Sequence, residues 1–145
     1  MPAAFVTVAC LAVLTACGDD SAAVTSTDPV EVKVGEAFEW NGFAIEEGWR
    51  IIGVDRAVDM ETVTTPEVSG TIVNQSERKR VALFQLVFST GGEPVATVNC
   101  SAARMITGQA KSFLCPGINT TMPQDYDAVV VQEFTRETTP DTSSS

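Results

Sequence analysis

The succession of short apolar segments separated by turn residues constrains the fold of this chain more than any other feature. The segments are rich in β-branched and aromatic residues, and Gly, Pro, Asn and Ser lie between them. They occupy residues 30–34, 37–40, 43–45, 49–54, 67–74, 80–90, 95–100, 110–115 and 126–134. No convincing helical periodicity accompanies them. Successive antiparallel hairpins of this kind predict an all-β domain built as a two-sheet sandwich.

The segment at residues 80–90 is the most apolar part of this pattern. Residues 81–88 are apolar on both faces of a strand, with Phe84, Leu86 and Phe88 on one side. A strand that is apolar on both faces is expected to lie in the middle of a sheet. Turn residues precede it at 77–80 and follow it at 89–94, so the sequence predicts a hairpin on each side.

The N-terminal segment indicates export. Residues 3–16 carry no charge, yet fourteen residues are too few for a bilayer-spanning helix, which needs about 20. A segment of this length is typical of a signal peptide. It ends in Leu14-Thr15-Ala16-Cys17, which resembles the bacterial lipobox. The resemblance implies cleavage after Ala16 and a diacylglycerol on the Cys17 thiol, which would hold the chain on the extracytoplasmic face of the cell membrane. An ordinary cleaved signal peptide or a chance apolar stretch is the alternative.

Four parts of the chain follow from these patterns. Residues 1–16 are the predicted lipoprotein signal peptide, and residues 17–28 are the lipidated cysteine followed by a flexible tether without an aromatic or large aliphatic cluster. Eleven such tether residues span about 18 Å on average. Residues 29–134 are the predicted β-sandwich domain. Residues 135–145 are polar and aperiodic, which predicts a disordered tail.

The cysteines predict one disulfide. Of the four, Cys10 would leave with the signal peptide and Cys17 would carry lipid, so Cys100 and Cys115 remain. In an oxidising compartment these two are expected to pair, and a loop of about 15 residues predicts a stabilisation of roughly 3 kcal/mol. A redox pair or a zinc site is the alternative, but the spacing is not C-x-x-C and the chain contains no histidine.

Charge and composition exclude several classes of function. The chain has 9 Lys and Arg against 19 Asp and Glu, a net charge of −10, and none of these residues lies within 1–16. Such a surface repels nucleic-acid phosphates, so no nucleic-acid partner is expected. The lack of histidine removes the commonest general base and zinc ligand. No phosphate-binding glycine loop or Ser-x-x-Lys pattern occurs either, and we therefore predict a protein that is not an enzyme, with no catalytic residue, metal or cofactor.

One aromatic group is a candidate ligand platform. Trp40, Phe43 and Trp49 lie close together in the sequence and could stack on sugar rings or on a peptide. Aromatic residues in a sandwich more often fill the core, as the buried Trp of immunoglobulin domains does. The core interpretation is favoured, and the platform is the alternative.

Two charged groups were also considered as sites. Asp55, Asp59 and Glu61 could collect a calcium ion, but the sequence has no D-x-[DN]-x-[DN]-G loop. Arg78-Lys79-Arg80 is the one basic run, and it could touch anionic headgroups. A solvated hairpin tip is the favoured interpretation of this run.

A family resemblance supports the same fold. The sequence at residues 68–76 (VSGTIVNQS), 82–88 (ALFQLVF) and 91–96 (GGEPVA) resembles the FxLYD-type, immunoglobulin-like β-sandwich domains of bacterial lipoproteins. That pattern is a G-x-x-x-N-x-S hairpin, a long apolar strand and a glycine turn, and it covers about residues 67–115. The Phe-x-Leu-Tyr-Asp core itself appears only as Leu-Val-Phe-Ser at 86–89. The acidic, histidine-free composition also resembles that of actinobacterial lipoproteins.

Two functions remain open from the sequence. The favoured one is a membrane-anchored, non-catalytic interaction module whose partner is another protein of the cell envelope. The alternative is a solute- or ion-binding accessory of a transporter or sensor. Two observations suggest this alternative, the net charge of −10 and the aromatic group.

Overall fold

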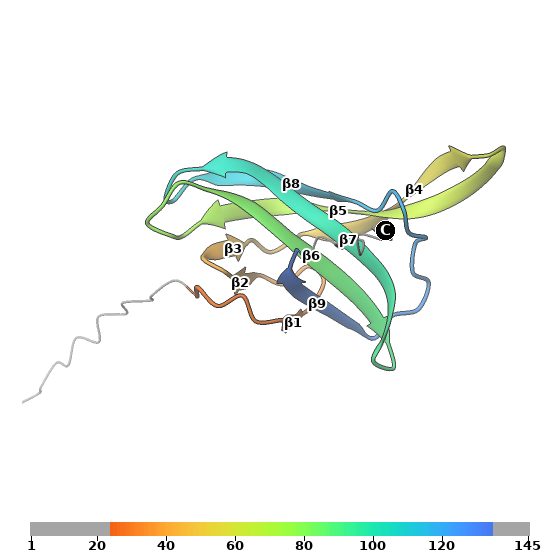
Figure 1. Cartoon of the computed structure of the whole chain (residues 1–145), viewed down its shortest axis with the longest axis horizontal. Coiled ribbons are helices and arrows are strands. Elements are labelled where there is room, and N and C mark those ends of the chain that lie inside the picture. The colour runs from red at the N-terminus through yellow and green to blue at the C-terminus, as the bar shows by residue number, and fades with distance from the viewer. Residues whose placement is uncertain (1–23, 135–145) are drawn as a thin grey trace, which may run out of the picture.

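The computed structural model describes residues 24–134, and within that range all nine predicted segments form strands and no helix occurs (Figure 1). The strands are β1 (Val30–Val32), β2 (Phe38–Trp40), β3 (Phe43–Ile45), β4 (Arg50–Val58), β5 (Glu61–Asn74), β6 (Arg80–Thr90), β7 (Glu93–Met105), β8 (Ala110–Pro116) and β9 (Ala128–Glu133). Every pairing is antiparallel. The predicted all-β, antiparallel fold class is confirmed.

The strands follow one hydrogen-bonded path that closes around a shared core. The order along the path is β1-β9-β6-β7-β8-β5-β3-β2, and β4 pairs with β5 outside it. Between β7 and β8 the path narrows to a single residue pair, Ser101 with Leu114. This seam divides the path into two halves, which contribute side chains to one hydrophobic cluster. The arrangement is that of a small, strongly curled β-sandwich.

The central strand is placed as predicted, with one difference on its outer face. β6 lies between β9 and β7, and Phe84, Leu86 and Phe88 are all buried toward the core. On the outward face, Val81 and Leu83 are 43% and 54% exposed, whereas Gln85 is 8% exposed. The central position is therefore confirmed, although the apolar outward residues at the start of β6 face solvent.

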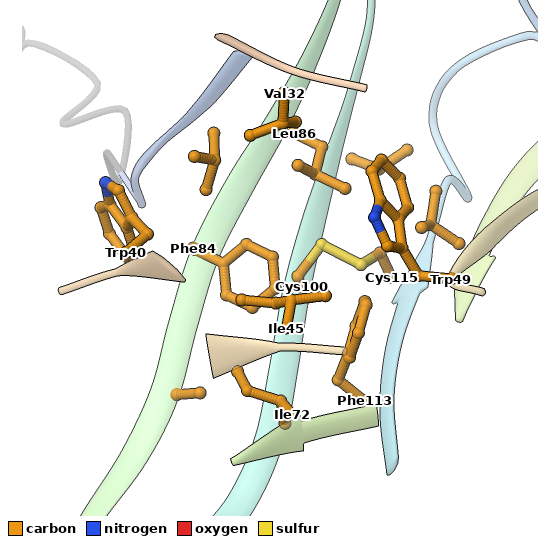
Figure 2. Packing of buried hydrophobic residues seen from close by; sticks show 14 of the residues in the cluster. Val32, Trp40, Ile45, Trp49, Ile72, Phe84, Leu86, Cys100, Phe113 and Cys115 are labelled. Atoms are coloured by element: carbon orange, nitrogen blue, oxygen red, sulfur yellow. A yellow bond between two sulfur atoms is a disulfide. The ribbon is translucent and has the colours of Figure 1, made fainter. Parts of the chain in front are cut away.

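The disulfide between Cys100 and Cys115 is confirmed, and it lies at the seam (Figure 2). Cys100 belongs to β7 and Cys115 to β8, and their exposed fractions are 2% and 0%. The Cα atoms are 4.1 Å apart. Since the ladder between these strands has a single residue pair, the covalent bond holds together the two halves where hydrogen bonding is sparse.

The predicted termini fall largely outside the described residues. The signal peptide at 1–16, Cys17, the first part of the tether and the tail at 135–145 all lie there. The last residues of the predicted tether are described, and they contact the domain. The Asn41 amide donates to the Ser26 carbonyl over 3.1 Å, and the Trp40 indole N–H donates to the Asp28 carbonyl over 3.0 Å. The folded domain thus begins before residue 29, by Val24, whose carbonyl accepts from the Gly42 amide.

Candidate interaction surface

The three aromatic residues of the candidate platform are core residues. Trp40, Phe43 and Trp49 are 2%, 2% and 1% exposed and belong to the hydrophobic cluster. Figure 2 shows the two tryptophans among the other core side chains. The Trp49 indole N–H donates to the Glu36 carbonyl over 2.7 Å, and that of Trp40 is bonded as described above. Of the two interpretations, the structure therefore supports the core, because these rings present no open face to a ligand.

The three residues of the basic run differ in their surroundings, because one is bonded within the domain and two are exposed. The Arg80 guanidinium donates to the backbone carbonyl of Asn41 over 2.6 Å and to the side-chain Oδ1 of Asn41 over 3.1 Å. It also lies 4.8 Å from the centroid of the Phe43 ring, a cation–π distance. Arg80 therefore ties the start of β6 to the turn between β2 and β3. Arg78 and Lys79 remain exposed on the hairpin.

The carboxylates considered for calcium do not converge. Asp55 accepts a hydrogen bond from the Thr64 hydroxyl over 2.8 Å, and Asp59 lies in a turn with a φ of 48°. Among residues 24–134, no group of three or more His, Cys, Asp or Glu side chains is placed to hold a metal ion. Within the same range every buried side-chain nitrogen or oxygen has a hydrogen-bond partner. The buried polar side chains of the described domain are thus hydrogen-bonded within the fold.

Two of the surface hollows among the described residues are small. One has a volume of about 260 Å³ and is lined by Thr97, Asn99 and residues 116–119. The other has a volume of about 300 Å³ and lies where Arg50 and Ser69 meet β8. Ligand pockets commonly measure about 300–1,000 Å³ and enclose most of the ligand, so these hollows are at or below the lower end of that range.

The most distinctive feature of the surface is an arm made by β4 and the first half of β5. The two strands pair over nine residues, from Arg50 with Ser69 to Val58 with Glu61, and the hairpin extends away from the sandwich (Figure 1). Its turn is Asp59-Met60, with φ values of 48° and 72°. Two consecutive positive φ values characterise the tight turns that match the twist of a hairpin.

The two edges of the arm differ. Along the β5 edge, the Gly117 amide donates to the Pro66 carbonyl and the Met122 amide to the Thr64 carbonyl, each over 2.8 Å. The segment between β8 and β9 therefore covers that edge. Along the other edge, β4 has no strand partner besides β5 in the described part of the chain. The other strands at the ends of the path, β1 and β2, have three residues each, so β4 is the longest strand of the described domain that pairs with one other strand alone.

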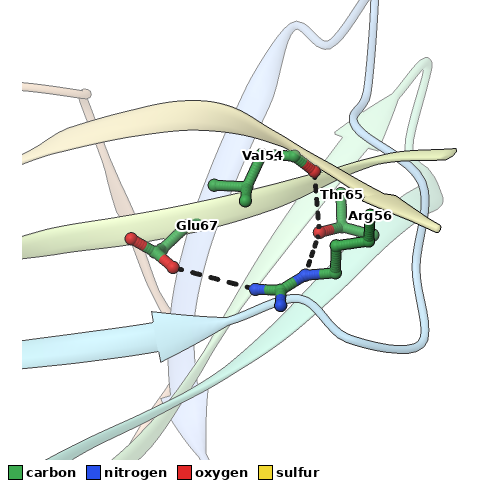
Figure 3. A network of polar contacts seen from close by, with 4 residues as sticks. All are labelled: Val54, Arg56, Thr65 and Glu67. Carbon is green, nitrogen blue, oxygen red and sulfur yellow. Dashed lines mark hydrogen bonds and ion pairs between the residues drawn. The ribbon is translucent and has the colours of Figure 1, made fainter. Parts of the chain in front are cut away.

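Cross-strand polar contacts hold β4 against β5 (Figure 3). The Arg56 Nε–H donates to the Thr65 hydroxyl over 2.9 Å, and this hydroxyl lies 3.4 Å from the Val54 carbonyl oxygen that accepts from it. The Arg56 Nη2 lies 3.9 Å from the Glu67 Oε2. Both side chains of this ion pair are partly exposed, so it contributes less than about 1 kcal/mol. Its main effect is to compensate the charge of Arg56.

The arm carries exposed apolar side chains. Met60 at the tip is fully exposed, and Val58 and Ile52 on β4 are 50% and 39% exposed. A long open strand with apolar side chains is a template for pairing with another chain. The arm is therefore the candidate interaction surface, hereafter the β4 edge, which comprises residues Arg50–Val58.

Sequence reasoning did not find this surface. The segment at 49–54 was expected to end four residues earlier than β4 does, and β5 was expected to begin at 67 instead of Glu61. Asp-Met lacks the glycine that usually marks a two-residue hairpin turn. The β-branched run at residues 62–65 was the available signal.

Comparisons with known proteins add no relative. No family model, no curated protein and no solved structure matches this chain. Among residues 24–134, no helix has the length and apolar character needed to cross a membrane.

Proposed function

We propose that this protein is a lipoprotein of the bacterial cell envelope, anchored through Cys17 on the extracytoplasmic face, that works as a non-catalytic protein-interaction module. The observation that carries the proposal is the β4 edge, a nine-residue strand left open on a disulfide-stabilised domain. The disulfide supports export, since such bonds persist in oxidising compartments outside the cytoplasm. The lipobox-like sequence at residues 14–17 supports the anchor.

The β4 edge suits β-augmentation. In this binding mode a partner adds a strand to an open sheet edge, main-chain hydrogen bonds supply affinity, and alternate side chains supply specificity. Alternate residues of β4 direct their N–H and C=O groups away from β5, as in any antiparallel ladder. The apolar side chains of Ile52 and Val58 would contact the added strand.

Of the two observations that suggested the alternative, a solute- or ion-binding accessory, one no longer supports it. The aromatic rings that suggested it are core residues, and only the net charge of −10 still supports it. Membership of the FxLYD-type group remains a prediction that rests on the resemblance at residues 68–96.

Replacing the anchor residue tests the location. We expect Cys17→Ser to abolish lipidation and signal cleavage at Ala16, and to remove most of the protein from the lipid-modified fraction, because the serine hydroxyl offers no thiol to acylate. Metabolic labelling with palmitate and the mobility of the processed chain are the measurements. Cys10→Ser is the matched control, since Cys10 lies within the predicted signal peptide, and it should change neither readout. Normal labelling of Cys17→Ser would contradict the proposal.

Crosslinking from the β4 edge tests the interaction. A photo-reactive amino acid at Ile52 in the full chain, irradiated in intact cells, should give a discrete adduct on a denaturing gel, because this side chain lies on the open edge and is 39% exposed. The same amino acid at Val95, 42% exposed on β7, is the control and should give none or a different adduct. The absence of any adduct specific to position 52 would overturn the interaction function.

A further inference from the structure

The β4 edge is suited to pair with the same edge of a second copy of this chain. In the described residues of a second copy, three strands pair with one neighbour only, and two of them, β1 and β2, are three residues long. Among these three, β4 with nine residues is the strand that matches the full length of β4. A pairing of identical edges is isologous, so the contact closes after two copies.

Symmetry restricts how two copies of β4 can align. Hydrogen-bonded and non-hydrogen-bonded residue pairs alternate along an antiparallel ladder. A two-fold axis can exchange two residue pairs only if both are of the same kind, hydrogen-bonded or non-hydrogen-bonded. The axis must therefore pass between the two copies of one residue, which face each other. The register is therefore defined by that central residue, and residues equally distant from it face each other across the two strands.

The number of paired residues and the charges together select one register from this set. A centre at residue 53 places Arg50 opposite Arg56 of the second copy, and centres at 55 and 56 place Asp55 or Arg56 opposite itself. Like charges directly opposite each other destabilise a strand pair. A centre at Val54 pairs all nine residues and places no like charges directly opposite.

The side chains that meet in the Val54 register are compatible. On one face Arg50 would lie opposite Val58 and Arg56 opposite Ile52, so that aliphatic arginine stems cover apolar side chains. The charge of Arg56 is already compensated by Glu67 at 3.9 Å within the same copy. On the other face Asp55, which accepts from Thr64, would lie opposite Gly53, the residue with no side chain to oppose it.

We propose that the protein forms a homodimer in which two β4 strands pair antiparallel with Val54 facing Val54, which joins the two arms into a four-stranded sheet in the order β5-β4-β4-β5. The inference rests on the proposed function, since it names the partner of the β4 edge as a second copy. Pairing would remove the long open edge from solvent, and an unpaired edge of this length is an aggregation hazard. It would also give each assembly two lipid anchors.

Opposite charges at position 54 test the dimer. The full chain in detergent should be a dimer by size-exclusion chromatography with light scattering. Val54→Lys and Val54→Asp should each weaken dimerisation more than about tenfold, because like charges then face each other across the contact. An equimolar mixture of the two variants should form a heterodimer, because lysine then faces aspartate. Val95→Lys and Val95→Asp are the matched controls, because Val95 is an exposed valine of β7 outside the proposed contact, and they should remain dimeric.

A cysteine test covers the case in which a charged variant fails to fold. Val54→Cys should form an intermolecular disulfide, since directly opposite Cα atoms are about 4.5–5.5 Å apart and disulfides need about 4.4–6.8 Å. Val58→Cys should not, because position 58 faces position 50 in this register. Three results would overturn the dimer. The parent chain could be monomeric, the mixture of folded Val54→Lys and Val54→Asp could fail to dimerise, or crosslinking at positions 54 and 58 could be equal. An adduct from Ile52 to a different protein would overturn it too while leaving the interaction function intact.

Discussion

Phe84→Ala is expected to lower the free energy of unfolding by about 4 kcal/mol, which is within the range for truncating a buried aromatic ring. Phe84 is 1% exposed, and its ring centroid lies 5.6 Å from that of Phe113 and 6.3 Å from that of Trp40. These rings come from β2, β6 and β8, so Phe84 packs across both halves of the sandwich. Denaturant unfolding of the full chain, followed by tryptophan fluorescence, measures the change.

Leu83→Ala is the matched control for Phe84→Ala. Leu83 is the preceding residue of β6 and points outward, with 54% of its surface exposed. Its truncation should cost less than about 1 kcal/mol, because little apolar surface leaves the interior. A loss of stability at Leu83 equal to that at Phe84 would contradict the assignment of inner and outer faces along β6.

Local sequence patterns were sufficient to predict most of the fold. The alternation of β-branched and polar residues located all nine strands, and the apolar run around Phe84 located the central one. The disulfide was predicted by elimination, since the predicted lipobox and signal peptide would account for Cys17 and Cys10, and the structure confirms the pair that remains. These features depend on neighbouring residues or on composition, which is why a single sequence reveals them.

The candidate site depends on contacts between distant residues, and the sequence could not predict it. Whether β4 is open is decided by the segment after β8, because Gly117 and Met122 bond to the β5 side of the arm and leave the β4 side uncovered. The favoured core interpretation of Trp40 and Trp49 is confirmed, but their hydrogen-bond partners, the backbone carbonyls of Asp28 and Glu36, were not predicted. No local pattern encodes these pairings.

Asn74, at the end of β5, is a fully buried polar residue whose side chain makes four hydrogen bonds. Its side-chain amide donates to the Arg78 carbonyl over 2.7 Å and to the Met105 carbonyl over 3.0 Å. Its Oδ1 accepts from the Ser76 amide over 3.1 Å and from the Ser76 hydroxyl over 2.7 Å. One side chain thus joins the hairpin between β5 and β6 to the end of β7. The Asn of the G-x-x-x-N-x-S pattern therefore has a structural explanation that requires no ligand.

Asn74→Ala is expected to lower the free energy of unfolding by about 3 kcal/mol, because it removes four hydrogen bonds and leaves the buried Met105 carbonyl without its side-chain donor. Denaturant unfolding measures the loss. Asn99→Ala is the matched control: Asn99 is exposed on β7 and accepts one hydrogen bond from the Gln85 side chain over 2.9 Å. Its replacement should cost less than about 1 kcal/mol, because water can reach the site. Equal losses at the two asparagines would show that Asn74 does not join the hairpin to β7 in this way.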